Sequence, residues 1–196
     1  ERNGMDNADC IMCVSELTRQ TVINHYGQDP AKCFAMHNAV YPLAPELQAI
    51  VDQRLPYKDR KEKVITFLGR ITMQKGPEYF IEAAKGKQVF EIFRDSDVYV
   101  MPSVSEPFGI SPLEAMQSGV PSIISKQSGC AEILDKCIKT DYWDIDAMAD
   151  AMYSLCTNPS LHEYLQVEGK KEVDGITWEK VGERIRKLYD QVLAKY

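Results

Sequence analysis

The stretch "DVYVMPSVSEPFGISPLEAMQSG" (97–119) joins two different patterns through one loop. Residues 97–103 are mostly apolar and read as a buried strand, because a strand covered on both faces needs no polar alternation. Residues 111–119 open on Ser-Pro and end on Gly, which is typical of a helix start and a helix stop. A strand that leads through a short loop into a helix is the repeating unit of an α/β fold.

Working outward from this stretch, apolar runs alternate with helical patterns along the whole chain. Short buried strands that alternate with helices predict an α/β fold with a Rossmann-like, doubly wound and mostly parallel sheet. In such sheets, ligands bind beyond the carboxyl ends of the strands. Strands are expected at 10–14, 32–40, 63–69, 97–103, 120–125 and 137–140, and helices at 15–27, 77–85, 88–96, 111–119, 144–156, 160–173 and after 177.

Composition narrows the classes of function. The 196 residues carry a formal net charge of −6, and 44% of them are hydrophobic. An acidic balance argues against nucleic acid as a partner, since binding nucleic acid requires a basic face. No apolar run approaches the roughly 20 residues of a membrane span. The chain opens on Glu1 without a signal peptide, and we expect that upstream sequence is missing.

The six cysteines are scattered, which favours a reducing, cytoplasmic setting over a disulfide framework. Cys10 and Cys13 have the C-x-x-C spacing of zinc and redox sites, but the chain has no second pair of this kind. Their apolar neighbours favour core packing of a strand. No metal site is therefore predicted.

The end of the strand at 63–69 carries cations. Gly69 permits a tight turn, Arg70 and Lys75 follow it, and Pro77 opens a helix. A guanidinium, an ammonium and the free N–H groups of a helix start together suit a phosphate. Two cations exposed to solvent in a loop would have the same spacing, so spacing alone does not decide between a phosphate site and an ordinary loop.

The end of the strand at 97–103 carries acids. Ser111, Pro112 and Glu114 have the spacing of an N-cap, a first helical residue and the third residue of a capping box. Glu114 therefore has a structural explanation as part of that box. Glu106 lies upstream of the helix and has no such explanation.

The loop between these acids is suited to an anion. Gly109 and Ile110 lie just ahead of the predicted helix, where backbone N–H groups would face a phosphate. A carboxylate beside a phosphate would repel it unless the carboxylate accepts hydroxyl hydrogens, and sugar hydroxyls are the natural donors. The loop of Glu106 thus indicates a phosphate flanked by polyols, which describes a nucleotide sugar.

Several segments together resemble one enzyme family, the retaining GT-B glycosyltransferases of the family-4 and glycogen/starch-synthase type. The most specific match is to their E-x7-E motif, and the resemblance covers nearly the whole chain. The segments are "SEPFGISPLEAMQSGVPSIIS" (105–125), "FLGRITMQKGPEYFIEAA" (67–84), "SGCAEIL" (128–134), "ITWEKVGERIRKLYDQVL" (176–193), "ADCIMCVSELTRQTVINHYG" (8–27) and "KCFAMHNAV" (32–40).

The resemblance implies roles for individual residues and no metal. Arg70 and Lys75 would bind the donor diphosphate and stabilise the leaving group. Glu106 would contact the donor sugar and stabilise positive charge, and Glu114 would hold the ribose hydroxyls. Other substrate-binding positions would be Gly69, Gly109, Ile110, Ser111 and Glu132, although Glu132 suits a helix-start role equally well.

The resemblance also implies a domain organisation. Residues 1–40 would be the end of the N-terminal acceptor domain, residues 41–177 the donor-binding domain, and residues 178–196 a crossover helix. The donor-binding domain departs from the family near residue 85, where at least one βαβ unit is missing, roughly 30 residues or more. We expect a true deletion here to remove central strands of the sheet and to leave the base pocket incomplete.

The expected activity is retaining transfer of a sugar, with glucose favoured, from a UDP-, ADP- or GDP-sugar to a glycan or small-molecule hydroxyl. The histidine that the family places near the donor sugar has no counterpart, because His25, His37 and His162 lie outside that motif. We therefore expect this chain alone not to turn over. A non-catalytic nucleotide-sugar-binding or regulatory domain is the alternative, and an epimerase of the same architecture is disfavoured by "EPFG".

Overall fold

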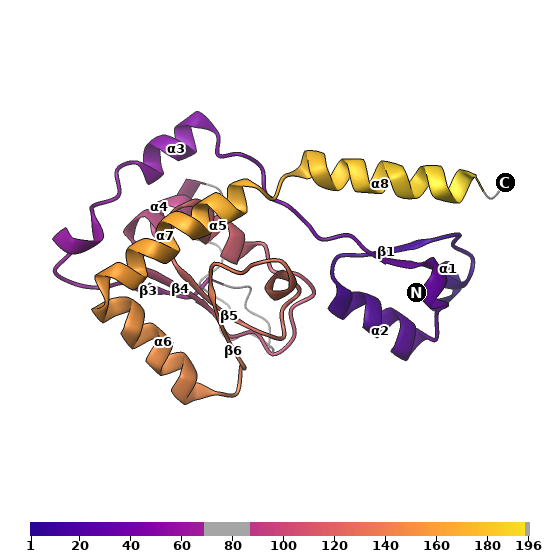
Figure 1. Cartoon of the computed structure of the whole chain (residues 1–196), viewed down its shortest axis with the longest axis horizontal. Helices are drawn as coiled ribbons and strands as arrows, with labels where there is room; N and C mark the ends of the chain where they lie inside the picture. Colours follow the sequence, from indigo (N-terminus) through magenta and orange to yellow (C-terminus); the bar gives the residue numbers. More distant parts are fainter. Residues whose placement is uncertain (69–86, 195–196) are drawn as a thin grey trace.

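The computed structural model describes residues 1–68 and 87–194 (Figure 1). Gly69, Arg70, Lys75 and the helix expected at 77–85 lie outside the described residues. No helix in the described ranges is long and apolar enough to cross a membrane.

The main unit, residues 41–177, is built on a parallel sheet. Its four strands are β3 (Ile65–Thr66), β4 (Val98–Met101), β5 (Ser122–Ser125) and β6 (Ile138–Thr140), and they lie in the order β3-β4-β5-β6. The predicted parallel sheet is therefore confirmed.

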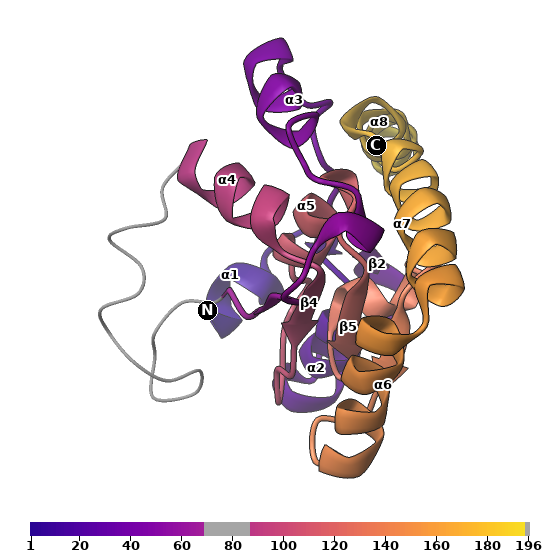
Figure 2. The same ribbon diagram turned by 90° about the vertical axis from the view of Figure 1, so that its left-hand side faces the viewer.

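Helices cover both faces of this sheet (Figure 2). Tyr99 and Met101 of β4 pack in one apolar cluster with α4 (Lys87–Asp95) and α5 (Ser111–Gln117). The alternate residues Val98 and Val100 pack in a second cluster with α6 (Ile145–Thr157) and α7 (Pro159–Asp174). Because successive side chains of a strand point to opposite faces, β4 is buried on both sides, as expected for a doubly wound fold.

The order of the strands bears on the deletion expected near residue 85. β3 pairs directly with β4, with Ile65 opposite Val98 and Thr66 opposite Tyr99. Within the described residues, β4 is the only neighbour of β3, so β3 forms an edge. A unit missing near residue 85 would extend the sheet beyond β3, as in doubly wound sheets of order 3-2-1-4-5-6. Residues 69–86 lie outside the described residues, so the expected loss of central strands stays a prediction.

The N-terminal unit, residues 1–40, forms a small layer of its own. β1 (Ile11–Cys13) pairs in parallel with β2 (Cys33–Ala35), and α2 (Glu16–Tyr26) covers them after the short α1 (Arg2–Asp6) and before the turn η1 (Pro30–Lys32). Ser15 caps α2 by accepting from the Thr18 N–H. Cys13 and Cys33 are buried in this layer, which agrees with core packing.

The chain passes between the N-terminal unit and the main unit twice, at Val40 and at α8. Val40 bridges to Thr177 just before α8 (Trp178–Leu193), and α8 then leaves the main sheet toward the N-terminal unit (Figure 1). Arg184 of α8 donates to the Ala35 carbonyl at 3.1 Å. Val181 and Leu188 of α8 are buried. The segment after Val40 contains α3 (Pro45–Val51) and η2 (Tyr57–Asp59).

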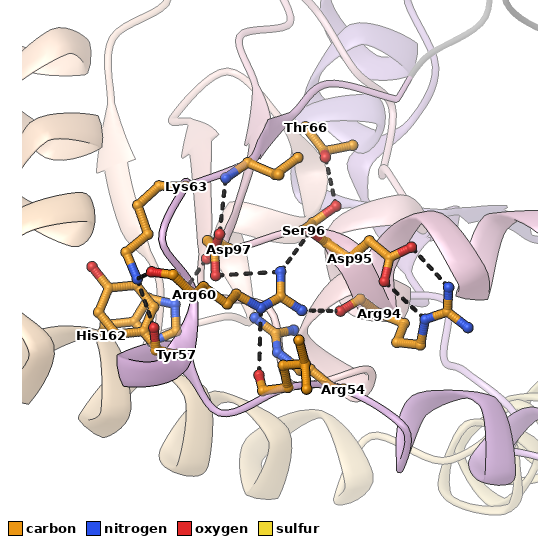
Figure 3. Close-up of polar contacts among 12 residues, drawn as sticks. Arg54, Tyr57, Arg60, Lys63, Thr66, Arg94, Asp95, Ser96, Asp97 and His162 are labelled. Carbon is orange, nitrogen blue, oxygen red and sulfur yellow. Dashed lines mark hydrogen bonds and ion pairs between the residues drawn. The ribbon is translucent and has the colours of Figure 1, made fainter.

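A buried polar cluster fixes the amino ends of β3 and β4 (Figure 3). Asp97 is fully buried; its Oδ2 accepts from the Val64 N–H at 2.8 Å, and its Oδ1 lies 3.5 Å from Arg60 Nη1. His162 Nε2 donates to the Asp97 carbonyl at 2.9 Å, and Tyr57 stacks on the His162 ring. These groups lie at the strand ends opposite to the ligand-binding edge, so we assign them a structural role.

We expect this cluster to make the fold acid-sensitive. Burial lowers the pKa of His162 to about 4 from an ordinary value of 6.5, so the folded state prefers the neutral ring. The stabilisation from the neutral ring is complete above pH 6.5 and is lost as the pH falls toward 4. That loss amounts to roughly 3 kcal/mol of unfolding free energy.

Urea unfolding of the chain at several pH values between 7 and 4 measures this effect. His162→Gln retains a donor for the Asp97 carbonyl but does not titrate, so its unfolding free energy should depend less on pH than that of the wild type. Parallel pH profiles of the two proteins would contradict the assignment.

Candidate functional site

The candidate site lies at the carboxyl edge of β3, β4 and β5, where the parallel strands end together. The loop after β4 contains Glu106, and the turn after β5 leads into η3 (Gly129–Glu132). We call residues 105–109 the Glu106 loop and residues 127–130 the Gly129 turn. Together with the start of α5, they form the described part of the site.

Backbone hydrogen bonds join the Glu106 loop to the Gly129 turn. The Glu106 N–H donates to the Gln127 carbonyl at 3.2 Å, and the Gly129 N–H donates to the Glu106 carbonyl at 3.0 Å. The Cys130 N–H also donates to the Phe108 carbonyl at 2.7 Å. The backbone that carries Glu106 is therefore held at a fixed position relative to β5.

Two glycines allow this close packing. Gly109 has a φ of 87°, a left-handed conformation that side chains other than glycine rarely adopt. At Gly129, a Cβ atom would lie 2.2 Å from the Pro107 carbonyl oxygen and 2.5 Å from Ser15 Cβ. The Gly129 turn thus touches both the Glu106 loop and the N-terminal unit.

The start of α5 differs from the predicted capping box. The N-cap is Ile110, and the Glu114 N–H donates to the Ile110 carbonyl at 3.1 Å. Ser111 is the first helical residue, and its Oγ lies 2.8 Å from the Tyr99 hydroxyl instead of capping the helix. The predicted capping box is therefore wrong, and Glu114 loses its structural explanation.

The Tyr99 hydroxyl ties three elements together at this edge. It donates to the Leu68 carbonyl at 3.0 Å, just after β3, so Ser111 Oγ–H is left to donate to Tyr99. Burial raises the pKa of Tyr99, which keeps this hydroxyl protonated. The bonds position the end of β3 against the start of α5.

Glu114 is a half-buried acid, and no hydrogen bond or ion pair of its side chain occurs within the described residues. Burial raises the pKa of its carboxyl. A buried carboxylate without donors is costly, unless a ligand supplies them. Glu114 therefore has a carboxylate that can accept hydrogen bonds from a ligand.

A cavity of about 330 Å³ opens beside Glu114. Aromatic and aliphatic side chains form most of its wall, and Glu114 and Gln117 supply the polar groups. Sequence patterns did not indicate this wall, because most of its residues come from separate parts of the chain: residues 39–43, α3, α4 and α8. Its aromatic members are Tyr41, Phe90 and Trp178.

Glu132 lies apart from Glu114 and contacts the N-terminal unit. Its two carboxylate oxygens accept from the N–H groups of Glu16 and Leu17, both at 2.8 Å. Its Oε2 also lies 2.6 Å from His37 Nε2. Sequence reasoning missed His37 as its partner, since nothing local joins residues 37 and 132.

The structure therefore brings Glu106, Gly109, Ile110, Ser111 and Glu114 to one edge. Gly69, Arg70 and Lys75, predicted at the end of the neighbouring strand, lie outside the described residues. In the ranges that the structure describes, no group of three or more His, Cys, Asp or Glu side chains could hold a metal ion.

Comparison with known families matches the central part of the chain. Residues 85–172 match the family described as "Glycosyl transferases group 1". This segment contains the Glu106 loop, α5 and the Gly129 turn.

Two curated proteins align with most of the chain. The uncharacterized glycosyltransferase MJ1607 of Methanocaldococcus jannaschii is 23% identical over 91% of this chain and 59% of its own length. The alpha-maltose-1-phosphate synthase of Mycolicibacterium smegmatis is 24% identical over 99% of this chain and 66% of its own. The chain thus spans about 60% of their length. The alignments run over 231 and 256 positions, so these relatives carry residues that the 196-residue chain lacks.

Solved structures share the fold. Sucrose-phosphate synthase from Thermosynechococcus elongatus superposes with a TM-score of 0.74 at 19% identity, covering 100% of this chain and 61% of that protein. Anabaena HepE, solved in complex with UDP and glucose, has a TM-score of 0.72 at 13% identity and covers 95% and 64%. The chain therefore has the GT-B fold in shortened form.

Proposed function

We propose that this chain, whose residues 85–172 match the group 1 glycosyltransferases, is the donor-binding part of a retaining glycosyltransferase of the GT-B type. The reaction would move a sugar, with glucose favoured, from a nucleotide sugar to a hydroxyl of a glycan or small molecule. One observation carries the proposal: Glu106 and Glu114 lie at the ligand-binding edge of the sheet, and Glu114 lacks a partner within the described residues.

The nucleoside would be held by Glu114. Ribose presents two neighbouring hydroxyls, which are donors that a carboxylate accepts, and the apolar cavity beside Glu114 can take a planar base. The volume of about 330 Å³ lies at the lower end of ordinary ligand pockets. Its aromatic wall suits the flat faces of a base.

The diphosphate would be held without a metal. We assign its binding to the side chains of Arg70 and Lys75 and to the backbone of Gly69. The backbone at the start of α5, at Gly109, Ile110 and Ser111, would add N–H donors. Cations at this place neutralise the charge that develops on the leaving nucleoside diphosphate, which is the main electrostatic task of the reaction.

The sugar would be held next to Glu106. The reacting carbon of a glycosyl donor acquires oxocarbenium character in the transition state, and a carboxylate nearby stabilises that positive charge. The fixed backbone of the Glu106 loop suits this role, because electrostatic stabilisation depends on groups that are already positioned.

Nucleotide binding tests the proposal directly. We expect titration calorimetry of the full gene product to detect binding of UDP, ADP or GDP, and Glu114→Gln to weaken that binding by roughly 10- to 100-fold, because a hydrogen bond to a charged group is lost. Glu183→Gln, on an exposed face of α8, is the matched control and should leave the Kd unchanged.

Two outcomes separate the alternatives. Absence of binding to all three nucleoside diphosphates would contradict the proposal. Binding without transfer or donor hydrolysis, across a panel of nucleotide sugars, would favour the non-catalytic nucleotide-sugar-binding domain instead.

A further inference from the structure

We propose that Glu132 is a positioning residue, which holds the N-terminal unit against the Glu106 loop and so sets the place of Glu106. The effect expected on kcat rests on the proposed function, whereas the effect expected on hydrogen exchange does not.

Glu132 completes the N-terminus of a helix that belongs to the other unit. The first N–H groups of any helix lack partners inside the helix. In α2, Ser15 Oγ accepts from Thr18, and the two oxygens of Glu132 accept from Glu16 and Leu17 at 2.8 Å each. A carboxylate at this end is also favoured by the helix dipole. The main unit thus supplies a cap that α2 cannot supply itself.

His37 strengthens the same link. It follows β2 in the N-terminal unit, and its Nε2 lies 2.6 Å from Glu132 Oε2. Its ring lies 6.2 Å from the ring of Phe108, which is buried within the Glu106 loop. His37 therefore contacts both Glu132 and that loop.

Close packing accompanies these polar contacts. Ser15 is fully buried, and its Cβ lies only 2.5 Å from the place that a Cβ on Gly129 would take. Thr18 Oγ1 donates to the Pro107 carbonyl at 3.5 Å, next to Glu106. The Glu106 loop is thus enclosed between the start of α2 and the Gly129 turn.

The geometry has a direct consequence for motion between the units. Separating them would expose two N–H groups of α2 and remove every described partner of the Glu132 carboxylate. It would also free one side of the Glu106 loop. Glu106 is therefore held in place most firmly when the units are joined.

A direct role of Glu132 in donor binding predicts different behaviour. Both of its oxygens already accept hydrogen bonds from the N-terminal unit, so a donor sugar would have to displace them. If Glu132 holds the joint, Glu132→Gln should lower kcat and leave nucleotide affinity unchanged. If Glu132 binds the donor, the same change should weaken donor binding first.

The chain offers a matched control in Glu172. Its two carboxylate oxygens accept from the successive N–H groups of Asp135 and Lys136, at 2.8 and 2.9 Å, but entirely within the main unit. Glu172→Gln therefore removes the same kind of interaction without touching the joint between the units.

We expect hydrogen exchange of the full gene product to separate these two variants. Glu132→Gln should speed exchange in peptides covering 15–19, 104–110 and 127–131, whereas Glu172→Gln should speed it only near 135–136. With turnover measured, Glu132→Gln should lower kcat by roughly tenfold, because the catalytic group is misplaced, and change the Kd for the nucleoside diphosphate less than twofold.

Two results would overturn the inference. Exchange in 104–110 that matches the wild type in Glu132→Gln would show that the joint does not set the Glu106 loop. A weaker Kd with unchanged exchange would make Glu132 a donor ligand. Failure of wild-type protein to bind any nucleoside diphosphate would instead contradict the proposed function and leave the exchange result decisive for the joint.

Discussion

Glu106→Gln is expected to slow sugar transfer by the full gene product by roughly 10²–10³-fold, the range seen when one preorganised electrostatic group is removed from an active site. Glutamine keeps the size and shape of the side chain but carries no negative charge. The positive charge that develops on the sugar would then lose its nearest carboxylate. The backbone bonds to the Gly129 turn do not involve the side chain, so the loop should keep its conformation.

Transfer rate and nucleotide affinity should respond separately in this experiment. Single-turnover rates with a donor sugar measure the chemical step, and calorimetry with the nucleoside diphosphate measures binding. Glu106→Gln should change the first and leave the second within a factor of about two. Glu114→Gln should show the reverse order of effects, with affinity lost first. A transfer rate within threefold of the wild type would remove Glu106 from the catalytic role.

Gly129→Ala is expected to lower the unfolding free energy strongly, although it adds only one methyl group. Its Cβ would lie 2.2 Å from the Pro107 carbonyl oxygen and 2.5 Å from Ser15 Cβ. One neighbour is backbone and the other is a fully buried side chain, so neither can move aside cheaply. We expect a loss of about 3 kcal/mol in unfolding free energy, at the upper end for overpacking, and a fall in Tm of roughly 6–12 °C.

Gly182→Ala is the control for this substitution. Gly182 lies inside α8, and a Cβ there would meet nothing within 4 Å. Because alanine favours helices over glycine, this variant should gain up to about 1 kcal/mol. Thermal unfolding of both variants measures the difference. Equal Tm values for Gly129→Ala and the wild type would show that the close contact of the two units is not formed in solution.

The sequence predicted the features that depend on local pattern. The buried run at 97–103 became β4, and the helix after it ends near Gly119, where the pattern placed its stop. These elements are specified by residues that are neighbours in the chain. The parallel pairing followed from the alternation of strands and helices.

The sequence failed where a distant residue competes with a local one. Ser111 has the spacing of an N-cap, but the Tyr99 hydroxyl binds its side chain, and the helix begins one residue earlier than the capping box required. Glu132 could not be paired with α2, because 115 residues separate it from Leu17. Such contacts are decided by tertiary packing, which local patterns do not contain.

Because β3 lies at the edge of the described sheet, the sheet can change beyond β3 without a change at β4 to β6. The loop after β4 carries Glu106 and helix α5 carries Glu114, and in the described residues β3 has β4 as its only neighbour. A βαβ unit added or removed beyond β3 would leave the register of the other strands unchanged. We therefore expect that a corresponding unit from a longer relative can be grafted between residues 85 and 87 as an exchangeable cassette. Such chimaeras should fold with β4, β5, β6 and the Glu106 loop unchanged, which hydrogen exchange of residues 97–140 measures.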